Sequence, residues 1–227
     1  FFTEQGRLYW TKVYELPEGN RQSKGRALQN MINIQKGDKV CAFIHVKNLS
    51  DMEYVQNHYL IFATKNGLMK KTTLEAYSRP RANGIIALGL REDDRLIRVT
   101  LTDGNSQMLV ASYNGKVVRF PEDTVRPMGR TATGVRAIKL DEDGKDRVIG
   151  MICVEQGSKD SVLVISEKGF GKRTLLDDEN GEPIYRITNR GGKGVKTMNI
   201  TDKTGNLIGL EAVNDDMDLM LITKAGT

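Results

Sequence analysis

One pattern of apolar and polar residues recurs along the whole chain. An apolar run ends in Ser or Thr, two residues intervene, and a Gly then precedes a basic stretch rich in β-favouring residues. Alternation with a period of two predicts strands, and Asn-Gly at 66–67 and 114–115 supplies the positive φ of a tight hairpin turn. The pattern predicts five hairpin turns, at Gly6, Gly67, Gly115, Gly169 and Gly226.

Each of the first four hairpins is followed by a second Gly, 17 to 25 residues after the first. Apolar pairs such as Leu88 and Leu90 come next and predict a further strand. An acidic turn then leads into another apolar run, as in RLIRVTL and RVIGMICV. Segments 73–78 and 121–126 predict single helical turns. A unit therefore contains about four short strands, with its second Gly at Gly25, Gly84, Gly134 or Gly194.

The length of the unit favours a propeller-like fold. Successive turns lie 48 to 61 residues apart, which is the length of a propeller blade. Four-stranded units repeated around an axis form a disc. We expect a single all-β domain over 1–227, with about four blades and partial units at both ends, because the pattern is interrupted inside a blade at each end.

Charge is distributed according to the repeat. The net charge is only +5, but stretches 1–30, 60–91, 113–140 and 165–200 hold 24 Lys/Arg and 11 Asp/Glu. The rest of the chain holds 10 basic and 18 acidic residues. Equivalent positions of a radial repeat occupy equivalent places on the disc, so the basic stretches predict a continuous positive band. The alternative is that these side chains only solvate exposed strands.

The position four residues after the hairpin Gly shows this best. It is Lys71, Arg119 and Arg173 in three units, and Trp10 in the first. A curved positive band suits sequence-tolerant binding of bent duplex DNA, held by phosphate contacts. The predicted DNA-binding residues are Arg7, Lys12, Arg21, Lys24, Arg26, Lys70, Lys71, Arg79, Arg81, Lys116, Arg119, Arg126, Arg130, Arg136, Lys172, Arg173, Arg190, Lys193 and Lys196.

The sequence shows no catalytic constellation. His45 and His58 are the only histidines, and neither lies in a recognisable acid–base arrangement. The run RGGKG at 190–194 is not a nucleotide-binding P-loop, because Val195 stands where Ser or Thr is required. The two cysteines lack the close pairing of a zinc site. We expect no catalytic residue, no metal and no cofactor in this chain.

Four stretches carry a family resemblance that covers essentially the whole chain. GRLYWTKVYELPE, NGLMKKTTLEAYSR, NGKVVRFPEDTVRPMGRTATGVRAIKL and GFGKRTLLDDE resemble the C-terminal domain of the A subunit of bacterial DNA gyrase, a type IIA topoisomerase. The resemblance implies a β-pinwheel, in which neighbouring blades exchange strands. It also implies a basic rim that wraps duplex DNA to support ATP-dependent negative supercoiling.

The same resemblance implies partners and a location. The partners are double-stranded DNA, the A-subunit dimer and the B subunits, where ATP and Mg²⁺ would be used; the location is the bacterial cytoplasm, with no membrane. The family's heptad Gln-Arg-Arg-Gly-Gly-Lys-Gly is matched only in its last five residues, at 190–194. The A-type subunit of topoisomerase IV therefore remains an alternative. A β-propeller that binds proteins and a propeller enzyme are two further alternatives.

Overall fold

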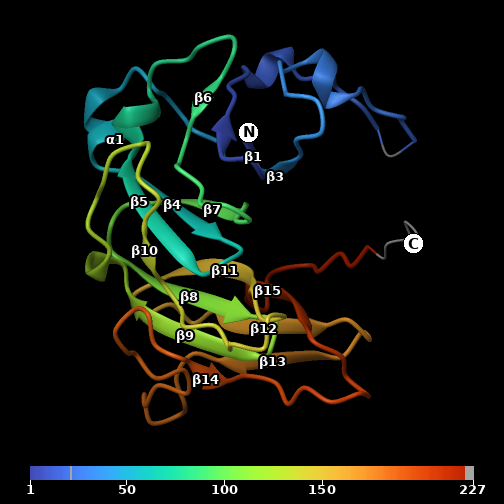
Figure 1. Ribbon diagram of the computed structural model, residues 1–227, viewed down its shortest axis with the longest axis vertical. Coiled ribbons are helices and arrows are strands. Elements are labelled where there is room, and N and C mark those ends of the chain that lie inside the picture. Colours follow the sequence, from blue (N-terminus) through green and yellow to red (C-terminus); the bar gives the residue numbers. More distant parts are fainter. Residues whose placement is uncertain (21, 223–227) are drawn as a thin grey trace.

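The computed structural model describes residues 1–20 and 22–222, which form four antiparallel sheets arranged around an arc (Figure 1). The first sheet has the order β3 (Val40–Ala42), β1 (Phe2–Thr3), β2 (Arg7–Leu8), β6 (Ile85–Ile86). The second has the order β10 (Val135–Arg136), β5 (Leu68–Thr73), β4 (Tyr59–Thr64), β7 (Leu96–Thr102). The third has the order β11 (Val148–Glu155), β8 (Ser106–Ser112), β9 (Lys116–Pro121), β14 (Val195–Lys196), and the fourth β13 (Gly171–Leu175), β12 (Ser161–Ser166), β15 (Leu207–Val213).

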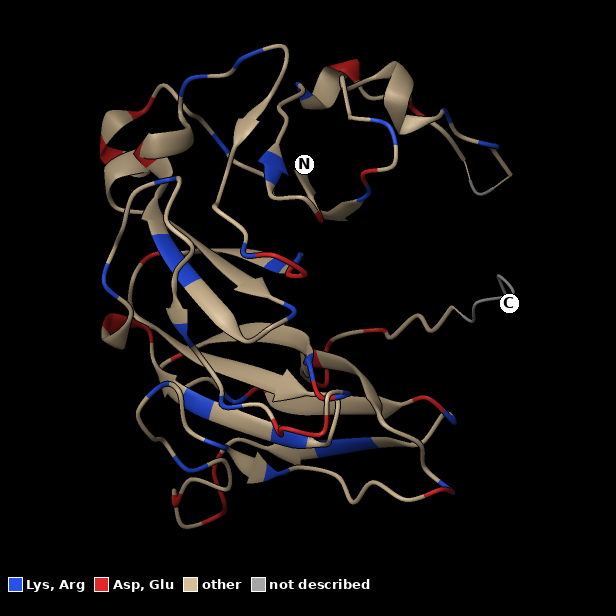
Figure 2. Ribbon diagram, in the orientation of Figure 1, with Lys and Arg blue, Asp and Glu red and all other residues tan. Residues whose placement is uncertain are grey.

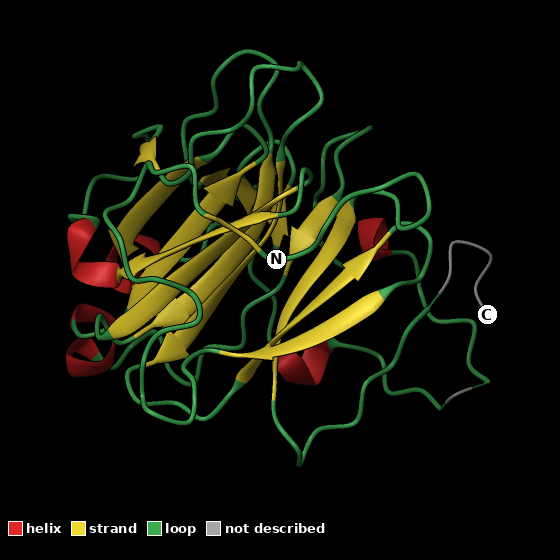
Figure 3. Ribbon diagram, turned by 90° about the horizontal axis from the view of Figure 1, so that it is seen from below, coloured by secondary structure: helices red, strands yellow, loops and turns green. Residues whose placement is uncertain are grey.

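The sheets exchange strands, as a β-pinwheel requires. Strand β6 follows β5 in the chain but pairs with β2, β10 pairs with β5, and β14 pairs with β9. Each of the first three sheets therefore takes its outer strand from the unit that follows. The inner strands β3, β7, β11 and β15 contact one another in succession along the inside of the arc. The all-β prediction is confirmed, and Figure 3 shows how little helix the domain contains.

In the four hairpin turns that the structure describes, the carbonyl of the recurring Ser or Thr accepts a hydrogen bond from the amide of the Gly. The fifth predicted turn, at Gly226, lies outside the described residues. The Thr64 carbonyl accepts a hydrogen bond from the Gly67 amide at 3.1 Å, and the Thr64 hydroxyl accepts one from the Leu68 amide at 3.2 Å. Thr3 makes the same two bonds, to Gly6 and Arg7. A short side chain that bonds its own turn and a Gly at positive φ together fix the hairpin, which explains the spacing in the sequence.

The apolar pair after the second Gly lies under the hairpin turn of the preceding unit. Ile138 and Leu140 pack so closely on Gly67 that a Cβ there would lie 3.0 Å from the Ile138 carbonyl oxygen. The amide of Ala137 also donates to the Gly67 carbonyl at 2.8 Å. The predicted strand is therefore only two residues long, and the residues beyond it support the neighbouring turn instead.

Acidic residues of the later turn hold the hairpin turn in place in the first three units. The Asp94 carboxylate accepts from the amide of Asn66 at 2.9 Å, and the Lys65 amide donates to the Arg95 carbonyl. Asp38 and Asp146 bond the equivalent amides of their own units. These carboxylates therefore cap turns.

The hydrophobic core lies between adjacent sheets. Phe62 joins Phe2 and Tyr77 in one cluster, whereas Ile61 on the opposite face of the same strand joins Val118 and others in the next. A third cluster fills the space between the last two sheets. Both faces of a central strand are buried, which explains why these strands are continuous apolar runs.

The helical segments are short. The single turns predicted at 73–78 and 121–126 are found as 3₁₀ turns, η3 (Leu74–Tyr77) and η4 (Glu122–Thr124). No pattern in the sequence predicts α1 (Met52–Gln56), which begins where the Asp51 side chain accepts from the Tyr54 amide. Two more 3₁₀ turns, η1 (Val13–Glu15) and η2 (Leu28–Asn30), lie in the long first loop. Within 1–20 and 22–222, no helix is long and apolar enough to cross a membrane.

Candidate nucleic-acid interface

Three segments on the outer edge of the arc carry positive charge without any negative charge. They are 79–90, 126–139 and 186–198, which contain the outer strands β6, β10 and β14. Together they hold ten Lys/Arg and no Asp/Glu. We call these three segments the basic rim. In Figure 2 the rim appears as blue on tan, whereas red lies on other parts of the chain, including the short helical segments.

The three segments form one continuous strip. The end of the first contacts the turn of the second, where the Gly89 amide donates to the Ala132 carbonyl at 3.2 Å. The end of the second contacts the turn of the third, where the Lys139 amide donates to the Gly192 carbonyl at 2.8 Å. Backbone hydrogen bonds therefore join the basic segments of neighbouring blades.

One side chain joins two segments of the rim. Arg190 donates to the Arg136 carbonyl at 3.3 Å and to the Thr124 carbonyl at 3.1 Å. A cation is thereby fixed over the boundary between blades. Among the residues that the structure describes, none of the ten rim cations forms a salt bridge. Their charge is consequently available to an external anion.

Most of the predicted residues lie on this rim or elsewhere on the surface. Eight are rim residues: Arg79, Arg81, Arg126, Arg130, Arg136, Arg190, Lys193 and Lys196. Lys12, Lys24 and Arg26 are exposed in the first loop, Lys172 and Arg173 are exposed on β13, and Arg7 and Lys116 are half-buried. Arg21 lies outside the described residues.

Two rim residues, Lys139 and Arg186, are not among the residues predicted from the sequence. Both are exposed and belong to the same acid-free segments. The sequence did contain a signal for these two residues, because the segments 126–139 and 186–198 contain no Asp or Glu. What the repeat spacing does not reveal is that these particular segments form the outer edge.

The prediction that the position four after the hairpin Gly forms the exposed band is wrong for two of its three cations. Lys71 and Arg119 are each only 4% exposed. Lys71 Nζ lies 2.8 Å from Glu122 Oε1, and Arg119 donates to the Asp177 carboxylate at 2.8 Å. Arg173 is exposed, but it is paired with Asp215 at 2.6 Å.

The physical reason is that this position joins blades. Lys71 and Arg119 each reach the segment that follows the second strand of the next unit, as does Trp10, whose indole N–H donates to the Tyr77 carbonyl at 3.1 Å. Arg119 also donates to the Leu176 carbonyl. A buried cation must be paired, and here the partner comes from the neighbouring blade.

Lys70 is also buried, which contradicts the expectation that it belongs to an exposed basic band. Its ammonium group contacts the carbonyls of Ala87 and Arg130, each at 2.5 Å, and the Tyr77 hydroxyl at 3.2 Å. It also lies 4.7 Å from the centre of the Phe62 ring. Burial, and then the charge of Arg130, lower the pKa of Lys70 to about 7. Lys70 anchors a rim loop from within.

In the described portion of the chain, no group of three or more His, Cys, Asp or Glu is arranged to hold a metal ion. The acidic turn at 141–146 is tied to its own hairpin instead. Asp141 pairs with Lys116 at 2.5 Å, and Asp143 accepts from the Asn114 side chain at 2.8 Å. The hydrogen bonds from Asn114 and from nearby amides hold the pKa of Asp143 at about 2.

Comparison with known proteins agrees with this architecture. A family model described as "DNA gyrase C-terminal domain, beta-propeller" matches residues 1–47, 58–103, 107–155 and 160–214. The chain is 44% identical over 226 residues to the A subunit of DNA gyrase from Staphylococcus aureus (strain NCTC 8325 / PS 47), and equally to that from strain COL. This covers 100% of the chain and 24% of either relative.

Two solved structures share the fold. The C-terminal domain of DNA topoisomerase IV gives a TM-score of 0.79 at 24% identity, covering 94% of this chain and 62% of that one. The C-terminal domain of DNA gyrase A gives 0.73 at 21% identity, covering 95% and 65%. The family model matches most of the residues, and its boundaries follow the four units. The chain belongs to the DNA gyrase C-terminal domain family.

Proposed function

We propose that the chain binds double-stranded DNA along the basic rim and bends it around the arc. The observation that supports this most directly is the rim itself: ten Lys/Arg without an acid, in segments joined by backbone hydrogen bonds. No α-helix of the described residues is longer than the five residues of α1, so direct reading of bases by a recognition helix is not part of the proposal. Binding depends on phosphates and has little sequence preference.

Binding of this kind is driven by the release of counterions. Each phosphate that the rim neutralises lowers the slope of log K against log salt by about 0.9. The rim follows the outside of an arc, so a duplex that contacts all three segments must curve. Phosphate contacts then offset the cost of bending, which is a few kcal/mol for a site of about 20–30 base pairs.

We also propose the setting of this binding. The relatives are named as the A subunit of DNA gyrase, and the chain spans about a quarter of their length. In this proposal the chain acts within a gyrase, beside its A and B subunits, in the bacterial cytoplasm. The chain holds the DNA, and ATP and Mg²⁺ are used in other parts of the enzyme. The 44% identity to gyrase A favours this over topoisomerase IV, for which the likeness is one of fold.

The experiment is a binding titration over several salt concentrations with duplexes of increasing length. We expect a steep negative salt slope and tighter binding to longer duplexes. In a triple variant, Arg126→Ala, Arg186→Ala and Lys193→Ala remove exposed rim charges that make no hydrogen bond in the described structure. The slope should become shallower by up to about 2.7, or 0.9 for each lost contact.

A matched variant removes three exposed cations elsewhere, with Lys36→Ala, Lys39→Ala and Lys159→Ala. It has the same net charge as the rim variant, so a general loss of charge affects both equally. We expect its salt slope to stay near that of the parent chain. Equal slopes for the two variants, or salt-insensitive binding, would contradict the proposal.

A further inference from the structure

One buried ammonium group contacts two segments of the basic rim from within. Lys70 Nζ donates to the carbonyl of Ala87, in the first rim segment, and to the carbonyl of Arg130, in the second, each at 2.5 Å. Its third acceptor is the Tyr77 hydroxyl at 3.2 Å. The Lys70 side chain is completely buried. An ammonium group has three donors, so this side chain uses its full hydrogen-bonding capacity to join the two segments.

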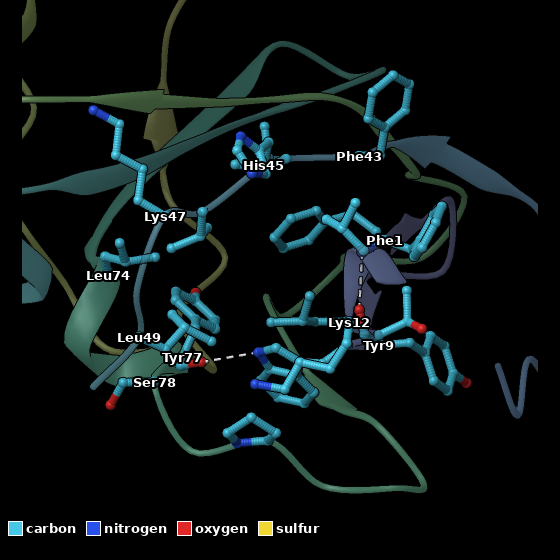
Figure 4. A pocket seen from close by; sticks show the side chains of 18 of the residues that line it. Phe1, Tyr9, Lys12, Phe43, His45, Lys47, Leu49, Leu74, Tyr77 and Ser78 are labelled. Atoms are coloured by element: carbon cyan, nitrogen blue, oxygen red, sulfur yellow. Dashed lines mark hydrogen bonds between the residues drawn. The ribbon is translucent and has the colours of Figure 1, made fainter. Parts of the chain in front are cut away.

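Tyr77 holds the ammonium group in place. Its hydroxyl donates to the same Ala87 carbonyl at 2.7 Å, and its ring packs on that of Phe62, with 5.8 Å between the ring centroids. The backbone of Tyr77 is fixed as well, because its carbonyl accepts from the indole of Trp10 at 3.1 Å, the bond drawn beside Tyr77 in Figure 4. The acceptors around Lys70 therefore belong to a rigid framework.

Lys70 has no carboxylate partner among the residues that the structure describes. The charged and titratable groups that face it are Tyr77 from η3 and Arg130 from the rim, while β4 contributes the Phe62 ring. Burial, and then the repulsion from Arg130, lower the pKa of Lys70 to about 7. Burial raises the pKa of Tyr77, so its hydroxyl keeps its proton. The charge on Lys70 therefore responds to an anion that neutralises Arg130.

The repeat shows that a blade does not need an ammonium group at this position. Three residues after its hairpin Gly, the third unit has Val118 in place of Lys70. Ten residues after that Gly it has Val125 in place of Tyr77. Both valines are buried in one apolar cluster. Apolar side chains thus satisfy the packing of a blade, and the buried cation of the second unit has a separate role.

We propose that Lys70 is a positioning residue for the DNA path: its ammonium group sets the relative position of the first two rim segments to match a bent duplex. This inference rests on the DNA binding proposed above. Phosphates that neutralise Arg130 also relieve its repulsion of the buried ammonium group, which favours the protonated form. By linkage, a duplex that curves over both segments binds more tightly when Lys70 is protonated, and its binding takes up a proton.

The test measures proton uptake and bending together. Calorimetric titrations at about pH 8, above the pKa of Lys70, in two buffers of different ionisation enthalpy give the number of protons taken up when a duplex of about 30 base pairs binds. We expect a large fraction of one proton, and an affinity that falls by at most about tenfold per pH unit as the pH rises from about 7 to about 9. Energy transfer between dyes at the two ends of the duplex reports the bend.

The variant Lys70→Met removes the ammonium group and keeps an apolar side chain of similar length. We expect an unchanged salt slope, because a buried Lys70 makes no phosphate contact, together with a smaller bend and no proton uptake. Lys159→Met is the matched control, since it removes one exposed positive charge away from the rim. It should keep the proton uptake and the bend of the parent chain.

Equal proton uptake or equal bending by the parent chain and Lys70→Met would overturn this inference and leave the proposed DNA binding intact. If Lys70→Met does not fold, the parent chain alone decides, and binding without proton uptake at about pH 8 overturns the inference. Absence of salt-dependent binding to any duplex would overturn the proposed function and this inference together.

Discussion

Lys71 Nζ lies 2.8 Å from Glu122 Oε1, and both side chains are buried. The pair joins the second strand of one blade to the 3₁₀ turn η4 of the next. Glu122 is further held by the Thr102 hydroxyl at 2.7 Å and by the Ser106 amide. This contact is a structural element of the interface between blades.

Breaking this pair should destabilise the domain strongly. Glu122→Gln leaves the Lys71 ammonium buried without its counter-charge, which costs about 3–5 kcal/mol. Urea unfolding followed by circular dichroism measures the loss. As a control, Arg98→Ala removes the exposed pair of Arg98 with Glu211, worth at most about 1 kcal/mol. A loss of equal size in the two variants would contradict the structural role.

Lys70 should make stability depend on pH. Its pKa of about 7 in the folded chain lies below the ordinary value of 10.5, so between these values the unfolded chain binds more protons. Stability should then rise as the pH rises from about 7 toward 10, and fall as the pH decreases through that window. Urea midpoints at about pH 7 and about pH 9.5 measure this rise. In Lys70→Met the increase in unfolding free energy between these two pH values should be smaller, because the titration of the Lys70 amine no longer contributes.

A glycine of the rim should be irreplaceable for steric reasons. At Gly134, where φ is +95°, an added Cβ would lie 2.3 Å from the Met69 carbonyl oxygen. Gly144 has a φ of +72° with nothing within 4 Å of a Cβ, so it isolates the cost of backbone strain. Gly144→Ala should cost about 1–2 kcal/mol. Gly134→Ala should cost clearly more, and should detach β10 from β5; urea unfolding of the two variants measures the difference.

The proposed bending of DNA makes a topological prediction. Nicked circles sealed with the chain bound should show a shift in linking number, because the curved rim imposes a curved path on the duplex. The triple variant Arg126→Ala, Arg186→Ala, Lys193→Ala should lose this shift, whereas the Lys36, Lys39, Lys159 variant should keep it. Gel electrophoresis of the sealed circles reads the result. A shift that persists in the rim variant would place the DNA path on another surface.

The repeat made most of the fold predictable. Ser or Thr three residues before Gly is a local rule, because its carbonyl accepts from the Gly amide and, at Thr3, Thr64 and Ser166, its hydroxyl also bonds the turn. Local rules of this kind can be read in the sequence. The pairing partner of a strand, in contrast, is not determined by the residues near it in the sequence. Nothing in Val135 and Arg136 says that they pair with Met69 and Leu68, about 67 residues earlier. Only the resemblance to a family pointed to the exchange of strands.

The same limit explains the errors at the candidate site. Lys71 and Arg173 occupy equivalent repeat positions, and one is buried while the other is exposed. The difference depends on the next unit, which places Glu122 within reach of Lys71. Charge counts along the chain identified the basic stretches, but only the packing between units shows which cations face outward.

Shared strands also determine how damage would spread. The loop between η4 and β10 belongs to the third unit, yet it ends in the outer strand of the second sheet, and its Arg130 carbonyl holds Lys70. A single protease cut between residues 126 and 134 would therefore loosen two neighbouring blades at once. Because each outer strand belongs to one unit and pairs with the sheet of another, the strands of the rim can separate only when the contacts between two blades are lost together.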